Sequence, residues 1–136
     1  MKKKRPLILI LVCAAALGAL AWWNLPVGIK VPKAAEIGEI TIFDGGTGKT
    51  FHITEEREIS QIIESLGTVK LKKDKLSVRY TGYSLRLTIY LKNGEEARGW
   101  NGFIINGEDF VRKAPFFYRA VDGTTGYGYL CTLLGK

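Results

Sequence analysis

The sequence contains only two cysteines and one histidine in 136 residues, and this scarcity excludes several kinds of structure. Cys13 lies near the N-terminus, so Cys131 has no partner for a disulfide in the rest of the chain. His52 is the single histidine, and the usual zinc and copper clusters need several histidine or cysteine ligands. We therefore predict no metal site, and we expect the protein to be held together by packing.

Charge is missing from residues 7–25, where only Asn24 is plainly polar. As a helix this run would be about 28 Å long, enough to cross the roughly 30 Å apolar core of a bilayer. Basic residues precede the run and indoles end it, which is typical of a membrane helix with a cytoplasmic N-terminus. We expect six residues to lie at the two membrane interfaces: Lys2, Lys3, Lys4, Arg5, Trp22 and Trp23.

Two other interpretations of residues 7–25 involve processing of the segment, by cleavage or by attachment of a lipid. In the first, Ala19-Leu20-Ala21 is a signal-peptidase site and the protein is secreted after cleavage near Ala21. In the second, Cys13 carries a lipid, but the branched Val12 before it and the short apolar run ahead of it disfavour this. The two bulky indoles directly after the cleavage site favour an uncleaved anchor.

We predict three parts: a signal-anchor helix over residues 1–25, a linker over 26–36 that contains Pro26 and Pro32, and one extracytoplasmic domain over 37–136. Four of the 20 basic residues lie in the first five positions. The other 16 are opposed by 13 acidic residues, so the exported part, linker and domain together, has only a small positive charge, and no nucleic-acid partner is predicted.

The domain is predicted to be α+β. Residues 37–43 and 50–53 have strand patterns around a glycine-rich turn. A helix is predicted over 54–66, with Thr54 as its N-cap and an apolar stripe at i, i+3, i+4 and i+7. The fold expected is a meandering antiparallel sheet with this helix packed on one face and a short C-terminal helix over 129–134.

The remaining strands follow from alternation and turn residues. Val69 and Leu71 begin a strand that we expect to turn at residues 72–75 and to return through Tyr80. Residues 83–91 form the longest alternating run, and the following Asn-Gly predicts a hairpin with residues 95–100. Residues 115–118 are predicted to form an apolar lid or edge.

No sequence motif predicts catalysis or a cofactor. The segment 45–50 ends in Gly-Lys-Thr like a phosphate-binding loop, but Phe43 occupies the position of the first glycine and a strand follows, so a hairpin is favoured. His52 is interpreted as a surface strand residue. The carboxylates beside Asn-Gly turns are interpreted as solvated loop charges: Glu95, Glu96, Glu108 and Asp109.

Two clusters could bind a partner. Five basic residues could contact anionic lipid or an anionic wall polymer, although lysine on a strand edge also prevents aggregation: Lys70, Lys72, Lys73, Lys75 and Arg79. A dense aromatic group could form a partner-binding surface, although such residues more often fill a core: Trp100, Phe103, Phe110, Phe116, Phe117 and Tyr118.

The layout resembles small membrane-tethered extracytoplasmic domain proteins of Gram-positive bacteria. The resemblance is carried by four segments: Ile40-Thr41-Ile42-Phe43-Asp44-Gly45, Thr47-Gly48-Lys49, Ile53-Thr54-Glu55 and Gly82-Tyr83-Ser84-Leu85. It implies a fold and a location, and no catalytic residues. We therefore expect a non-enzymatic, membrane-anchored module that binds a protein, a peptide or an envelope component. The alternatives are an envelope hydrolase with an unrecognised site and a released, secreted protein.

Overall fold

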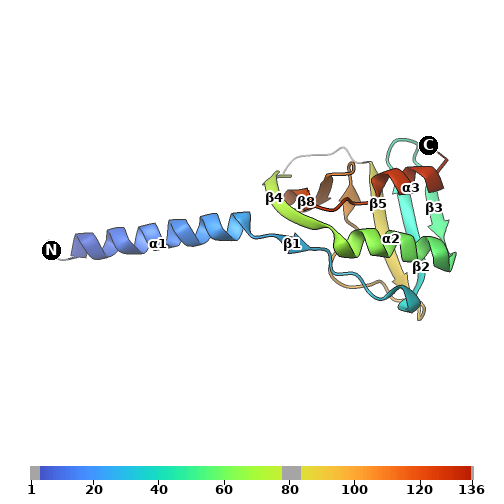
Figure 1. Cartoon of the computed structure of the whole chain (residues 1–136), viewed down its shortest axis with the longest axis horizontal. Coiled ribbons are helices and arrows are strands. Elements are labelled where there is room, and N and C mark those ends of the chain that lie inside the picture. The colour runs from blue at the N-terminus through green and yellow to red at the C-terminus, as the bar shows by residue number, and fades with distance from the viewer. Residues whose placement is uncertain (1–3, 78–83, 136) are drawn as a thin grey trace.

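A computed structural model describes residues 4–77 and 84–135 (Figure 1). The first element, α1 (Lys4–Asn24), projects away from the rest of the protein, and none of its residues is buried. Its apolar window has a mean hydropathy of 2.2, so α1 is long and apolar enough to span a membrane or to act as a signal sequence. Lys2 and Lys3 lie outside the described residues, whereas Lys4 and Arg5 begin α1.

The body of the protein is an eight-stranded sheet in which every pairing is antiparallel. The strand order is β1-β4-β8-β7-β6-β5-β2-β3. Their bounds are β1 (Val27–Gly28), β2 (Ile37–Asp44), β3 (Thr50–Ile53), β4 (Lys70–Leu76), β5 (Leu85–Leu91), β6 (Ile104–Ile105), β7 (Phe110–Lys113) and β8 (Phe116–Asp122). Together with the helices, this confirms the predicted α+β class.

One face of the sheet forms the core with the helices. α2 (Glu56–Thr68) buries the apolar stripe predicted from its spacing, Ile59, Ile62, Ile63 and Leu66. α3 (Tyr127–Leu133) adds Leu130, and η1 (Ala34–Glu36) is a single turn before β2. The sheet contributes alternating residues of its central strands to this inner face, among them Ile40, Ile42, Leu85, Leu87, Ile105 and Val111, all almost fully buried.

The predicted N-cap of the main helix was one residue too early. Glu55, not Thr54, is the N-cap of α2, and no side chain makes a capping hydrogen bond there. The short connection from β3 provides the physical reason, because the chain is still extended at Glu55 (φ −74°, ψ 127°). The two acidic residues of the first turn, Glu56 and Glu58, still favour the positive end of the helix dipole.

Two further predictions within the sheet were wrong, and a third was confirmed only in part. Residues 72–75 do not turn the chain: β4 runs through them and pairs with β8, with a bulge between Lys73 and Lys75. Residues 115–118 form neither a lid nor an edge, because β8 lies between β4 and β7. The predicted hairpin after β5 forms only in its first part: Leu91 donates its N–H to the carbonyl of Glu95, Tyr90 bridges Glu96, and Ala97 donates its N–H to the carbonyl of Ile89. The pairing does not continue to Trp100, and the N–H of Ile89 is bound by the side chain of Asn101. Arg79, Tyr80 and Tyr83 lie outside the described residues.

The segment predicted to be a linker contributes to the domain. Val27 and Gly28 form β1 and pair with Leu71 and Lys70 of β4. Ile29 is buried in the core. The connection between α1 and the sheet is therefore short and packed.

Candidate binding surfaces

The C-terminal end of α1 contacts the sheet through its two tryptophans. The ring of Phe116, at the start of β8, lies edge-on to both indoles, with ring centroids 5.8 Å from Trp22 and 5.7 Å from Trp23. Edge-to-face packing of this kind is a favourable geometry for aromatic rings. The residues predicted for the far membrane interface therefore also hold α1 against the domain.

Lys73 completes this contact, which we call the α1 junction (Trp22, Trp23, Lys73 and Phe116). Its side chain is only 8% exposed, and its Nζ donates a hydrogen bond of 3.3 Å to the carbonyl oxygen of Trp22. The same ammonium lies 4.1 Å from the centroid of a Trp22 ring. Carbonyls in the last turn of a helix lack intrahelical partners and carry negative partial charge, so a cation is favoured there.

The aromatic cluster predicted from sequence divides by burial. Trp100 packs against Tyr118 at 4.9 Å and against Phe103 at 6.1 Å, and Tyr118 contacts Phe116 at 6.0 Å, all measured between ring centroids. Phe103, Phe117 and Tyr118 are buried, whereas Trp100 and Phe116 are partly exposed. Four of the five proposed partner-binding residues thus form one continuous row, and it leads from α1 into the core.

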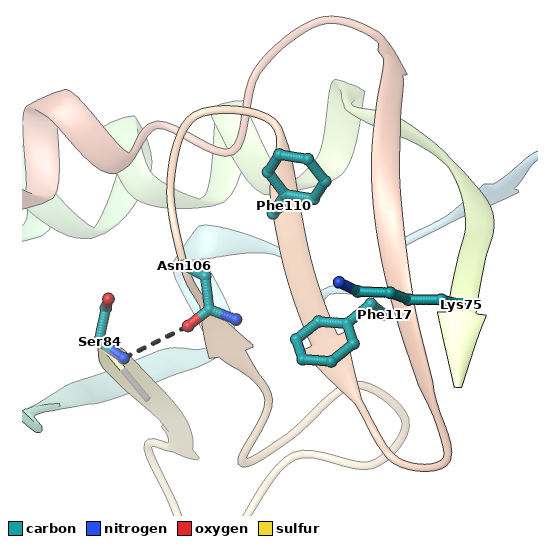
Figure 2. A pocket seen from close by; sticks show the side chains of 5 residues that line it. All are labelled: Lys75, Ser84, Asn106, Phe110 and Phe117. Carbon is teal, nitrogen blue, oxygen red and sulfur yellow. Dashed lines mark hydrogen bonds between the residues drawn. The ribbon is translucent and has the colours of Figure 1, made fainter. Parts of the chain in front are cut away.

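Phe117 lies apart from this row, on the opposite face of the sheet, which we call the outer face. Figure 2 shows the helices behind the sheet, with Lys75, Phe110 and Phe117 on the near side. Among the described residues, no helix or strand covers this face. Side chains alternate between the two faces along each strand, so the residues next to the buried ones lie on the outer face. The charged side chains of this face are mostly basic.

A single cross-strand row carries the most regular charge pattern of the outer face. Strand pairing aligns Lys75 with Phe117, Phe117 with Arg112, Arg112 with Ile104, and Ile104 with Arg86. Cations therefore alternate with apolar side chains. Because neighbouring strands lie about 4.8 Å apart, successive cations of the row are attached roughly 10 Å apart.

Two hollows lie along this row. The first, of about 290 Å³, is lined by Lys75, Ser84, Asn106, Phe110 and Phe117 (Figure 2). Its polar rim is ordered by a hydrogen bond of 3.4 Å from the backbone N–H of Ser84 to Oδ1 of Asn106. Lys75 Nζ lies 5.3 Å from the Phe117 ring, so its stem covers the apolar floor while its charge stays at the rim.

The second hollow, of about 450 Å³, has the size of a small-molecule cleft. Arg86 and Arg112, which flank Ile104 in the strand register, line it together with Lys113 and Ser77. No acidic residue lines it among the described residues. Guanidinium groups bind carboxylates and phosphates through paired hydrogen bonds, so this cleft favours an anionic group.

The other predicted residues lie elsewhere. Residues 44–49 join β2 to β3 as the predicted hairpin, and His52 lies exposed on β3 with its Nδ1 bonded to Oε1 of Glu39. Glu95 and Glu96 are exposed beside the turn after β5. Glu108 has a structural contact that was not predicted: its Oε1 accepts a 2.7 Å hydrogen bond from the backbone N–H of Gly128 in the first turn of α3.

In the described part of the chain, three groups have shifted pKa values, and none of them lies in the outer-face hollows. Burial raises the pKa of Tyr118 above its usual value of 10.0. Desolvation, followed by the neighbouring Glu55, raises the pKa of Glu58. Desolvation, Glu58 and Glu55 raise that of Tyr129. Within residues 4–77 and 84–135, no group of three or more metal-ligating side chains gathers.

Comparison with protein-family models, with curated proteins and with solved structures finds no match to this chain. Its function must therefore be argued from its own residues. The sequence alone does not predict that Arg86 and Arg112 lie on either side of Ile104, because these residues are distant in the chain and only the strand order β7-β6-β5 brings them together. For Arg86, the one available sign was its placement on the polar side of the alternating run 83–91.

Proposed function

We propose that this protein is a membrane-anchored extracytoplasmic domain that binds an anionic envelope component, or an acidic protein or peptide, without catalysis. α1 is the uncleaved anchor, with its N-terminus in the cytoplasm. The outer face of the sheet is the binding surface. The observation that carries the proposal is the 450 Å³ cleft between Arg86 and Arg112, which an anchored domain would hold close to the bilayer.

The α1 junction supports an uncleaved anchor. α1 continues as a helix past Ala21 to Asn24, and Trp22 and Trp23 are packed on Phe116. Proteases act most readily on exposed, irregular segments, so this docked helix is a poor substrate. The packing itself would survive cleavage after Ala21, so the intact mass of the native protein is the measurement that separates an anchored from a released product.

The outer face has the features of a ligand-binding surface rather than of a surface that packs against another part of the protein. Its cations are presented on a rigid sheet, and Ile104 and Phe117 beneath them are already buried by their neighbours. A ligand that places anionic groups over these cations would replace water at the charges without any rearrangement of the strands. An anchored domain also gains from proximity, because confinement to the membrane raises the effective concentration of envelope ligands.

The test is ligand capture by the full chain in native membranes, using photo-reactive side chains at Phe110 on the outer face and at Glu64 on α2. Both positions are exposed. We expect a specific adduct from position 110 that is lost in the double variant Arg86→Gln/Arg112→Gln. The matched control Lys49→Gln/Arg57→Gln, which removes two exposed cations elsewhere, should retain it.

The expected loss is large because two charge-assisted contacts are removed, and each such hydrogen bond contributes about 1.5–3 kcal/mol. Equal adducts from positions 110 and 64, or an adduct that persists in the double variant, would refute the outer face as the binding surface. Far-UV circular dichroism and the thermal midpoint of the double variant must match the parent, since both arginines are on one face of a sheet and neither is in the core.

A further inference from the structure

The strands nearest α1 carry most of the positive charge of the sheet. β4, β7 and β8 together contain seven lysines and arginines against two aspartates, Asp74 and Asp122. β2 and β3, at the other end of the sheet, contain no lysine or arginine and two acids, Glu39 and Asp44. Figure 1 places β4 at the side of the domain where α1 ends and β2 and β3 at the opposite side.

The position of β4 relative to the membrane surface follows from the α1 junction. α1 has 21 residues and is therefore about 31 Å long, so it would fill the bilayer core and leave Trp22 at the headgroup level. Lys73 Nζ lies 3.3 Å from the carbonyl oxygen of Trp22. A strand in contact with the interfacial end of a membrane helix must itself lie at the membrane surface.

The edge of β4 has the composition that a membrane surface binds. Among the described residues β1 pairs only with Lys70 and Leu71, so residues 72–76 form an open edge. Lys72 pairs with Arg119 and Lys75 with Phe117, so both lysines lie on the outer face beside this edge, and Leu76 at its end is 59% exposed. Exposed apolar side chains flanked by lysines bind the boundary between headgroups and acyl chains.

Protection against edge-to-edge aggregation explains only part of this charge. Lysines on an open edge discourage pairing with another sheet, and that accounts for those of β4. Arg112, Lys113 and Arg119 lie on β7 and β8, which are paired on both sides and have no open edge. The positive charge is thus a property of the whole end of the domain.

We propose that the β4 edge, formed by residues 72–76, is a second membrane contact that seats the domain on anionic lipid headgroups. Lys72 and Lys75 bind the headgroup phosphates and Leu76 enters the interface. Seating would fix the orientation of the outer face relative to the membrane, with Lys75 nearest the bilayer and Arg86 farther from it along the row. This inference rests on the anchor in the proposed function.

The test uses the full chain in lipid nanodiscs, with Cys13 and Cys131 replaced by serine. A fluorophore is attached at Leu76→Cys or, for comparison, at Thr47→Cys in the distal hairpin, and a spin-labelled headgroup lipid serves as the quencher. We expect strong quenching at position 76, little at position 47, and an increase at position 76 when phosphatidylglycerol replaces part of the phosphatidylcholine.

Charge variants then test the role of the lysines. Each lysine near an anionic surface contributes roughly fivefold to binding, so Lys72→Gln/Lys75→Gln should lower the ratio of seated to unseated domains about thirtyfold. The control Lys49→Gln/Arg57→Gln should keep the wild-type response. The proposed membrane contact of the β4 edge is refuted if quenching at position 76 does not exceed quenching at position 47. It is also refuted if quenching at position 76 does not change with anionic lipid, which is the result expected if the lysines bind a wall polymer instead.

The two proposals fail in different ways. If alkaline carbonate extracts the native protein from membranes, or its mass lacks the first 21 residues, the anchor is wrong and the proposed function falls with it. If the protein stays in the bilayer and position 76 is unquenched, the anchor stands and only the seat is wrong.

Discussion

Replacement of Phe116 by alanine should release α1 from the domain. Phe116 contacts both indoles at the end of α1, and each edge-to-face pair contributes about 0.5–1.5 kcal/mol, or about 2 kcal/mol together. The hydrogen bond from Lys73 to the Trp22 carbonyl contributes about 2 kcal/mol more. Ordering two tryptophan side chains costs about 0.5–1.5 kcal/mol each.

The net stability of the α1 junction is therefore about 2 kcal/mol, which corresponds to about 3% undocked molecules. Loss of the Phe116 ring removes about the same amount. The docked and undocked forms should then be about equally populated. A change of this size is measurable because the junction, unlike the core, is held by a few contacts.

The two native cysteines provide the assay. Cys13 lies in α1 and Cys131 in α3, so spin labels on both report the distance between helix and domain without further substitutions. We expect a narrow distance distribution for the parent protein in nanodiscs and a broad one for Phe116→Ala. Lys73→Met, which keeps an apolar stem and removes the charge, should broaden it to a similar extent.

Phe110→Ala is the matched control, because Phe110 is an aromatic residue on the neighbouring strand β7 and makes no described contact with α1. Its distribution should stay as narrow as that of the parent. If Phe116→Ala and Lys73→Met also stay narrow, the junction does not depend on these contacts and the reasoning on the depth of β4 fails with it. Thermal unfolding of each variant separates undocking from loss of the domain.

Two further predictions concern stability. Since burial raises the pKa of Tyr118 above 10.0, its stabilising neutral form is fully present below pH 10 and is lost as pH rises through the folded-state pKa; Tyr118→Phe should therefore reduce the alkaline loss of stability in a pH series of urea unfolding. Glu108→Ala should lower the free energy of unfolding by about 1 kcal/mol, because Oε1 of Glu108 accepts the N–H of Gly128 at the start of α3, whereas Glu95→Ala, on an exposed turn, should change it little.

Local sequence patterns predicted the helices and strands in which the spacing of apolar residues matches the spacing of the buried positions. The stripe of Ile59, Ile62, Ile63 and Leu66 has helical spacing and is buried as a unit, so α2 was found. The hairpin of β2 and β3 followed from alternation and its glycine-rich turn. Both depend on neighbours close in the sequence, and such contacts can be inferred without knowing the fold.

The errors arose where a distant partner decides the local structure. Four charged residues at 72–75 are typical of a turn, yet β8 pairs with them and Lys73 turns inward to the carbonyl of Trp22, 51 positions earlier. Likewise, the hairpin after β5 stops after Ala97, and the N–H of Ile89 is bound by the side chain of Asn101. Composition could not predict either contact, because each depends on the order of the strands.

The row of cations on the outer face also depends on the strand order, and only part of it could be predicted from the sequence. Of the three cations of the row, only Arg86 stands on the polar side of an alternating run that the sequence shows, whereas Lys75 was predicted to lie in a turn and Arg112 in no strand. That they are aligned follows only from the order β4-β8-β7-β6-β5, in which two apolar residues separate them. Because the row starts on the strand that contacts α1, the charge of the sheet, the α1 junction and the proposed membrane seat depend on one arrangement. A variant that undocks α1 should therefore also weaken quenching at position 76 while leaving Arg86 and Arg112 paired across Ile104.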